Sequence, residues 1–180
     1  EATQYAIQVA KENGSLISFD PNLRLSLWKT PEEARRRILY GMKQCDIMKI
    51  SEEEVAFVSE QESLEKGVSF IRDNSDIKIL FVTLGNKGSI AYYKDEKIYC
   101  GGIHQEHVVD TTGAGDTFCG AVLSRILELG TDALTEKDIR EMLLFANAAA
   151  SIVVTRKGAL CSMPEPEEIR AASSLIDKVL

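Results

Sequence analysis

The sequence predicts an α/β protein with a mostly parallel sheet, and two observations support this prediction. Strand and helix patterns alternate from Ile17 to Val82, and such alternation implies right-handed crossovers between parallel strands. Later in the chain, the β-branched pair Val108-Val109 precedes two close glycines and an apolar helical pattern from Phe118 to Leu129. This second pattern indicates a strand, a tight glycine turn and the start of a helix.

The helices are predicted from apolar spacing and from their end signals. A helical pattern begins at Ala2 and ends at Asn13-Gly14, which are residues typical of helix termini. Thr30-Pro31-Glu32-Glu33 predicts another helix start, because it combines a capping threonine, proline at the first helical position and acids in the first turn. Further helices are predicted at Glu62 to Asn74, at Ile139 to Val153 after a cap at Thr135, and at Pro164 to Leu180.

Short apolar runs predict buried strands, because a run of four to eight such residues is typical of a strand covered on both faces. The runs are Leu16 to Phe19, Cys45 to Ile50 and Ile79 to Thr83. Ser89 to Tyr93 and Lys97 to Cys100 predict a hairpin around the turn Lys94-Asp95-Glu96.

Composition excludes several classes of partner. The chain of 180 residues suits one domain and is long enough to bury a core. Its net charge of −7 and pI near 5.0 disfavour a surface for nucleic acid or an anionic membrane. The four cysteines lie far apart with no Cys-x-x-Cys pair. This spacing disfavours a zinc site or a disulfide framework and favours a reducing compartment, so we expect a cytoplasmic protein.

An anion site is predicted at the glycine turn. Gly113 and Gly115 allow the backbone to approach a ligand and to adopt positive φ without a Cβ penalty. The N–H groups of the first helical turn, together with the helix dipole, then favour an anion such as a phosphate. For Asp116, the residues alone leave two interpretations open: a carboxylate that stabilises the helix start, or a base held beside a phosphate.

A second candidate site follows the first predicted strand. The segment Asp20-Pro21-Asn22-Leu23-Arg24 lies at the C-terminal end of that strand, where ligands bind in open α/β sheets. The alternative is a plain turn, because Asp, Pro and Asn are turn formers. Ser51 and Glu54 have the spacing of a helix capping box.

Four segments, in order along the chain, resemble one family. The string Asp-Thr-x-Gly-Ala-Gly-Asp-x-Phe, from Asp110 to Phe118, resembles the C-terminal signature of the ribokinase-like sugar kinases, the PfkB family. Asp20 to Trp28 resembles the Asp-x-Asn-x-Arg…Leu-Trp segment of its fructokinase-like and ketodeoxygluconate-kinase-like members. Thr83 to Gly88 resembles the family's nucleotide loop, Thr-x-Gly-x-x-Gly. Ser51 to Glu54 takes the place of the family's Asn-x-x-Glu, with Ser for Asn as in fructokinase-like members.

The resemblance implies a ribokinase-like three-layer α/β sandwich. Residues 1–180 would form the C-terminal portion of a single sugar kinase domain, with the N-terminal half and the lid missing. The implied partners are a small-molecule sugar and a nucleotide, and a homodimer could form through that lid.

The resemblance also implies roles for particular residues. Asp116 is the general base that takes the proton from the sugar hydroxyl. The anion hole is formed by Gly113, Ala114 and Gly115. The sugar is bound by Asn22 and Arg24. The nucleotide is bound by Thr83, Gly85, Gly88, Asn147 and Gly158. Magnesium has Glu54 in its outer shell, and a potassium ion would lie near Asp110, Thr112, Arg156 and Gly158.

The implied function is ATP-dependent phosphorylation of a sugar hydroxyl, with fructose as the leading substrate and fructose 6-phosphate as the product. Two alternatives remain, a 2-keto-3-deoxygluconate kinase and a non-catalytic, kinase-like binding or assembly protein. The intact Asp116 disfavours the second of these. Since the family's N-terminal half carries most sugar contacts and the lid, the 180 residues alone are expected to hold a nucleotide weakly and to phosphorylate no sugar.

Overall fold

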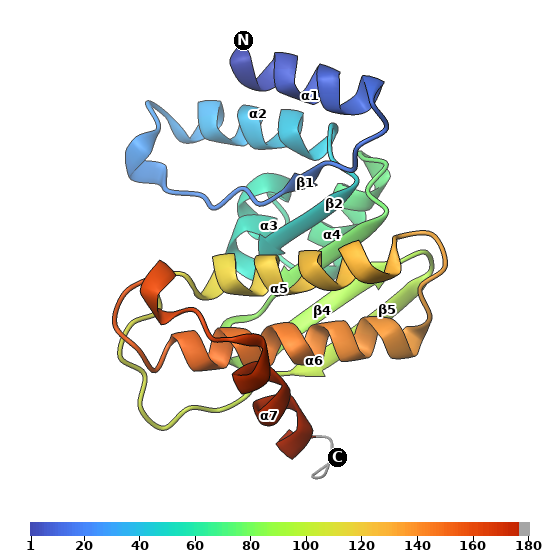
Figure 1. The fold of residues 1–180 in the computed structure, drawn as a ribbon. Helices are drawn as coiled ribbons and strands as arrows, with labels where there is room; N and C mark the ends of the chain where they lie inside the picture. Colours follow the sequence, from blue (N-terminus) through green and yellow to red (C-terminus); the bar gives the residue numbers. More distant parts are fainter. Residues whose placement is uncertain (177–180) are drawn as a thin grey trace. The chain divides into compact units, whose positions relative to one another are not determined.

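The computed structural model describes residues 1–176 and contains two compact units, Glu1–Val82 and Thr83–Leu180 (Figure 1). The strand order is β1-β2-β3-β4-β5. The sheet is mixed, because the β1–β2 pair is parallel and the β4–β5 pair is antiparallel.

The first unit combines strands with helices, and its strands β1 and β2 run parallel. Its strands are β1 (Ser18–Phe19), β2 (Ile47–Ser51) and β3 (Ile79–Thr83), and Ser18 pairs with Ile47. Its helices are α1 (Ala2–Glu12), α2 (Pro31–Met42), α3 (Glu52–Ser59) and α4 (Leu64–Asp73), with a short 3-10 turn, η1, at Leu25–Leu27. The Thr30 hydroxyl caps α2 by accepting from the Glu33 amide, as the sequence predicted.

Close packing explains two glycines in this unit. A methyl group at Gly41 would lie 2.6 Å from the Phe19 ring, and one at Gly67 would lie 2.6 Å from the Val55 side chain. The missing side chains therefore let α2 approach β1 and let α3 approach α4. The core around them contains side chains that are at most 3% exposed, among them Ile38, Met42, Met48, Ile50, Ile71 and Phe81.

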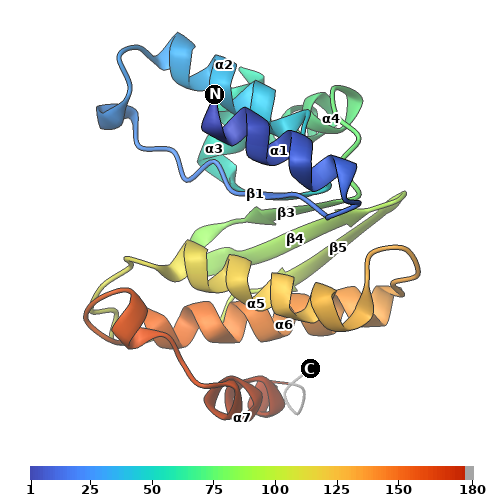
Figure 2. The same ribbon diagram turned by 45° about the horizontal axis from the view of Figure 1, so that its top comes forward.

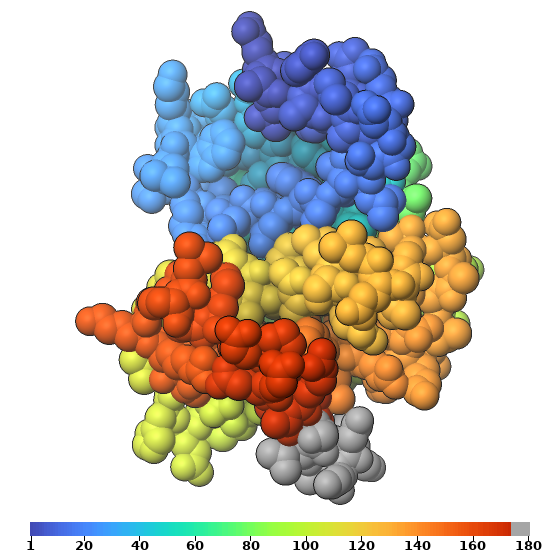
Figure 3. Space-filling view, in the orientation of Figure 1, coloured from blue at the N-terminus to red at the C-terminus, as the bar shows by residue number. Residues whose placement is uncertain are grey.

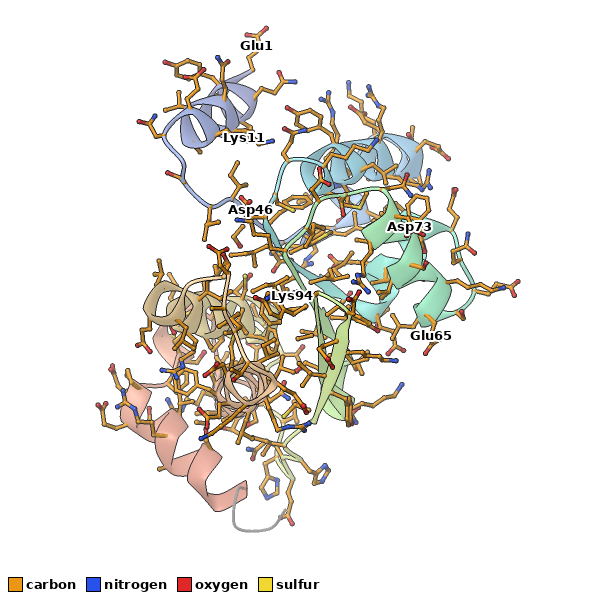
Figure 4. All side chains as sticks on the ribbon, turned by 90° about the vertical axis from the view of Figure 1, so that its right-hand side faces the viewer. Glu1, Lys11, Asp46, Glu65, Asp73 and Lys94 are labelled. Atoms are coloured by element: carbon orange, nitrogen blue, oxygen red, sulfur yellow. The ribbon has the colours of Figure 1, made fainter. Side chains whose placement is uncertain are left out.

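The prediction of a buried strand at Leu16 to Phe19 is wrong in length and in burial. Only Ser18 and Phe19 are in a strand, neither is buried, and Leu16 is 46% exposed. Helix α1 buries none of its residues either, and Figure 4 shows its side chains spread outward between the labelled Glu1 and Lys11. The apolar run has the composition of a covered strand, but β1 is a two-residue strand at the end of the strand order.

The second unit places two helices on a hairpin. Strands β4 (Gly88–Tyr93) and β5 (Glu96–Gly101) pair with Ser89 opposite Cys100, which confirms the predicted hairpin. Helices α5 (Ala114–Leu129) and α6 (Glu136–Val153) lie side by side on one face of the hairpin, and α7 (Pro166–Ile176) packs against α6 (Figure 2). The core between these layers includes Phe118, Val122, Ile139, Met142 and Leu143.

The strand predicted just before the glycine turn does not form. Residues 102–111 are irregular, and Val108 and Val109 are 57% and 59% exposed. The amides of Val109 and Asp110 donate to one carbonyl, that of Val154, at 2.8 and 3.2 Å. These hydrogen bonds satisfy the amides of Val109 and Asp110 without a neighbouring strand. The β-branched residues alone therefore do not predict a strand correctly here.

Candidate functional site

The glycine turn forms the start of α5, as predicted. Gly113 is the N-cap residue with φ 83°, in the left-handed region, and Asp116 lies in the first helical turn. A methyl group at Gly113 would lie 3.3 Å from the Cα and Cβ atoms of Ala159, so the turn is packed against the segment that follows α6. Gly115 is helical and has no positive φ, so the expectation of a left-handed conformation is correct only for Gly113. The first amides of a helix have no acceptor within it, and they face outward from its end.

Asp110 ties the turn to that following segment. Its Oδ1 accepts a hydrogen bond from the Thr112 amide at 2.9 Å, and its Oδ2 accepts one from the Gly158 amide at 3.2 Å. Hydrogen bonds from Thr112, and then from Gly158, lower the pKa of Asp110 below its ordinary value. Asp110, Thr112, Gly113 and Gly158, all predicted as site residues, are therefore brought together in the structure.

The segment after α6 is a surface turn of the second unit, drawn in orange-red in Figure 3. Gly158 has φ 103°, and its carbonyl accepts from the Ser162 hydroxyl at 2.5 Å. The guanidinium of Arg156 pairs with Glu168 of α7. The Arg156 side chain thus anchors the turn to α7, and only its main chain is left to take part in a cation site.

Asn147 connects α6 to the hairpin. Its side-chain nitrogen donates to the carbonyls of Cys100 and Gly101, both at 3.2 Å, and its oxygen accepts from the Ser89 hydroxyl at 2.9 Å. Asn147 is 7% exposed and Ser89 is fully buried. Contact between Asn147 and a nucleotide remains a prediction. The sequence did not reveal the partner Ser89, because a serine within a strand pattern carries no signal of its own.

The loop from Thr83 to Gly88 contains two glycines with positive φ, 59° at Gly85 and 109° at Gly88. They differ in their surroundings. A methyl group at Gly85 would meet nothing within 4 Å, whereas one at Gly88 would lie 2.2 Å from the Cys100 carbonyl oxygen. Gly88 is therefore required by the close approach of β5, and the open Gly85 is the position where a ligand could approach the backbone.

In the first unit, residues 20–24 form an irregular segment after β1. The Asn22 amide donates to Asp20 Oδ1 at 3.1 Å, and Asn22 has the left-handed φ of 42°. The Leu23 amide donates to Glu54 Oε1 at 2.6 Å. The side chain of Arg24 donates to the Leu23 carbonyl at 3.0 Å. The predicted sugar residues thus lie on a turn whose backbone is bonded to two carboxylates.

Glu54 forms the predicted capping box with Ser51, and it also binds the backbone of the 20–24 segment. Its Oε2 accepts from the Ser51 amide at 2.9 Å, while the Ser51 hydroxyl accepts from the Glu54 amide at 3.2 Å. Because Oε1 accepts from Leu23, both carboxylate oxygens already bind backbone N–H groups. The structure therefore brings Glu54 to the segment that carries Asn22 and Arg24.

A buried lysine beneath this segment was missed. Lys49 lies in β2, is 6% exposed, and pairs with Asp20 at 3.2 Å. Burial is the largest influence on Asp20 and raises its pKa, Lys49 opposes that rise, and Glu54 adds to it. The only sequence signal for it is a charged residue inside an apolar strand pattern.

Within residues 1–176, no group of three or more His, Cys, Asp or Glu side chains is arranged to hold a metal ion. Over the same residues, no helix has the length and hydropathy needed to cross a membrane.

Comparison with known proteins identifies relatives along most of the chain. Residues 1–166 match the family model of the pfkB family carbohydrate kinases. The chain is 43% identical over 166 residues to Fructokinase-1 of Zea mays, an alignment that covers 91% of this chain and 50% of that protein. The chain spans about half the length of the curated relatives it matches.

Solved structures agree with this family. A fructokinase double mutant from Vibrio cholerae O395, bound to fructose, ADP and a potassium ion, has a TM-score of 0.85 and 34% identity, over 94% of this chain and 54% of that chain. The aminoimidazole riboside kinase of Salmonella enterica, complexed with aminoimidazole riboside and an ATP analog, has a TM-score of 0.83 and 26% identity, over 97% of this chain and 57% of that chain. The predicted α/β fold and the predicted family are both confirmed. The chain belongs to the pfkB family of carbohydrate kinases.

Proposed function

We propose that this chain supplies the phosphate-transfer and nucleotide-binding part of an ATP-dependent sugar kinase, the C-terminal portion of a single kinase domain, and that the sugar is fructose. The observation that carries the proposal is the Gly113 turn at the start of α5, with Asp116 in the first helical turn. Backbone amides at a helix start stabilise phosphate charge, and a carboxylate beside them can take a proton from an attacking hydroxyl.

In this proposal Asp116 accepts the proton of the sugar hydroxyl. The amides of the Gly113–Gly115 turn stabilise the charge that develops on the transferred phosphate. Asp110 holds the turn in place through Thr112 and Gly158. The nucleotide lies along Thr83 to Gly88, with Gly85 as the point of closest approach and with Asn147 and Gly158 bordering it.

Magnesium would supply charge neutralisation across the phosphates of ATP. Glu54 fits a place in its outer shell, because both carboxylate oxygens already accept backbone N–H bonds and each retains a lone pair for a bound water. For potassium, the fitting groups are the carboxylate of Asp110 and main-chain oxygens of the Thr112 turn and of residues 156–158.

Fructose is proposed because curated fructokinases are among the relatives and because Asn22 and Arg24 occupy the fructokinase-like segment. The test uses the full-length protein that contains this sequence. Purified protein would be assayed with ATP against fructose, 2-keto-3-deoxygluconate, ribose and aminoimidazole riboside, with ADP release as the readout. We expect the highest kcat/KM for fructose. A higher kcat/KM for 2-keto-3-deoxygluconate would show that the proposed substrate is wrong and that the proposed sugar kinase reaction is right.

Asp116→Asn tests the base directly. We expect turnover to fall by about 10²–10⁴-fold, with little change in ATP affinity measured by calorimetry. Asp95→Asn, in the exposed hairpin turn of the same unit, is the matched control and should keep wild-type turnover. An Asp116→Asn variant with a tenth of wild-type activity would remove Asp116 from the base role. A wild-type protein that binds ATP and phosphorylates no sugar would favour a non-catalytic binding protein.

The isolated 180 residues give a separate test. We expect them to bind ATP weakly and to show no fructose phosphorylation in a coupled assay, because charge interactions open to water are weak. Measurable phosphorylation by residues 1–180 alone would mean that they contain a complete sugar site.

A further inference from the structure

The segment that carries the proposed sugar residues is held by buried charges rather than by regular structure. Asp20 and Glu54 accept the amides of Asn22 and Leu23, and these two hydrogen bonds fix the backbone on either side of the left-handed residue Asn22. A non-glycine residue in this conformation costs free energy and persists only where its surroundings impose it. The two carboxylates provide that constraint.

Asp20 is in turn held from below by Lys49. The ammonium lies 3.4 Å from Asp20 Oδ1 and 3.2 Å from Oδ2, so both oxygens face the same cation. The side chain of Lys49 is 8% exposed and that of Asp20 is 16% exposed. A charge buried in a strand is costly unless it is paired. The neighbours of Lys49 in β2, Met48 and Ile50, are apolar and fully buried. Lys49 is therefore the one position in this strand where a charge must be stabilised in the interior.

We propose that Lys49 is a positioning residue for sugar binding: it orients Asp20, and Asp20 with Glu54 holds the backbone that presents Asn22 and Arg24. The proposal rests on the sugar kinase function proposed above. Lys49 acts through Asp20 and touches no reacting atom. Removing it should therefore weaken sugar binding more than it slows phosphate transfer.

The first experiment is kinetic, on the full-length protein. Lys49→Met should raise the KM for fructose by about 10- to 100-fold, since a misplacement of about 1 Å is enough for an effect of that size. The KM for ATP and the kcat at saturating fructose should change little. Lys49→Arg, which retains a cation able to bond to Asp20, should recover part of the fructose affinity.

A matched control lies in the same unit. Lys78 pairs with Asp46 at 3.8 Å, and its side chain is 44% exposed. Lys78→Met also removes a lysine from an ion pair with an aspartate, but away from the 20–24 segment. It should leave both KM values unchanged.

The double variant Asp20→Asn/Lys49→Met separates positioning from stability. Removing both charges together avoids leaving one buried and unpaired, so the Tm should return toward the wild-type value. The KM for fructose should stay raised, because no ammonium orients residue 20. If the double variant restored both the Tm and the KM, the pair would be structural only and the proposal would be wrong. Should Lys49→Met fail to fold, this variant and Lys49→Arg still decide the question.

Hydrogen exchange provides a readout that does not depend on kinase activity. In Lys49→Met, the amides of Asn22 and Leu23 should exchange faster than in the wild type, while those of Ile79 to Thr83 in β3 should be unchanged. Unchanged exchange at Asn22 and Leu23 would overturn the positioning role. If the wild-type protein phosphorylated no sugar, the proposed function would fail, and the exchange rates would still test whether Lys49 holds the segment.

Discussion

The two parts of the chain that carry predicted site residues, one in each compact unit, are held in place by different means. In the first unit, the carboxylates of Asp20 and Glu54, with the ammonium of Lys49, hold an irregular segment. In the second unit, the turn around Gly113 is held mainly by backbone shape, by left-handed glycines and by one carboxylate, Asp110. The first part is therefore sensitive to loss of a charge, and the second to the gain of a methyl group.

Under the proposed function, the difference follows from what each part must present to a ligand. Asn22 and Arg24 offer side chains, and side chains are oriented by fixing the backbone that bears them. The turn at Gly113 offers main-chain amides, which a phosphate can reach only where no Cβ intervenes. Three substitutions, each with a matched control, and one labelling experiment would test this difference, in order of decreasing expected effect.

Gly88→Ala should have the largest effect on stability. A methyl group there would lie 2.2 Å from the Cys100 carbonyl oxygen and 2.5 Å from the Gly102 nitrogen, at a residue with φ 109°. Backbone strain and overpacking together should cost about 2–5 kcal/mol of unfolding free energy. Urea unfolding followed by circular dichroism would measure it.

Gly85→Ala is the matched control for Gly88→Ala. It lies in the same loop with φ 59° but has open space around it, so only the conformational cost of about 1–2 kcal/mol applies. Equal losses for the two variants would contradict the close approach of β5 as the reason for Gly88.

Glu54→Gln should have the next largest effect on stability. The carboxylate accepts from the amides of Leu23 and Ser51, and a glutamine keeps only one acceptor oxygen. Loss of a hydrogen bond to a buried charged group typically costs about 1.5–3 kcal/mol. The control is Asp138→Asn in the capping box of α6, where the carboxylate bonds only within the box, to Thr135. A greater loss of stability for Asp138→Asn would show that the contact with Leu23 adds nothing.

The features predicted from the sequence are those with a local cause. The capping box at Ser51, the helix cap at Thr135, the hairpin and the helix start after Gly113 each depend on residues a few positions apart. Lys49 with Asp20 and Ser89 with Asn147 are separated by 29 and 58 positions, and neither partner has a sequence pattern that identifies the other. The proposed roles of Asn22 and Arg24 rest on family resemblance, because Asp, Pro and Asn alone equally indicate a turn.

Two local signals were misleading for physical reasons. Val108 and Val109 have β-branched side chains, but their segment bonds to a single carbonyl, that of Val154, and stays exposed. Leu16 to Phe19 has the composition of a covered strand, but strand propensity reports packing that other elements must supply.

Gly113→Ala should destabilise the protein less than Gly88→Ala or Glu54→Gln, and its main effect should be on nucleotide binding. The φ of 83° costs about 1–2 kcal/mol for alanine, and the contact of 3.3 Å with Ala159 would shift the turn. Gly130→Ala is the control at the other end of α5, because Gly130 has φ 77° and open space around it. We expect similar unfolding free energies for both variants and weaker ATP binding, by calorimetry, only for Gly113→Ala. Equal ATP affinities would reduce Gly113 to a helix cap.

The smallest expected effect concerns the cysteines, which report on the two units without altering either. Burial raises the pKa of the Cys45 thiol in the first unit to about 12. Only about one thiol in 10⁴ would then be a thiolate at pH 8, and the thiolate is the form that reacts. Cys161, in the surface turn beside Gly158, is exposed. With an alkylating reagent at pH 8, Cys161 should be modified well before Cys45, as peptide mass spectrometry would show, and Cys161→Ser should remove the early label. Cys161 lies next to Gly158, because a methyl group on Gly158 would lie 2.8 Å from the Cys161 sulfur. If this turn borders the nucleotide, bound ATP should therefore slow the labelling of Cys161. Labelling unaffected by saturating ATP would place the nucleotide away from residues 157–161, while rapid labelling of Cys45 in the native protein would contradict its burial in the first unit.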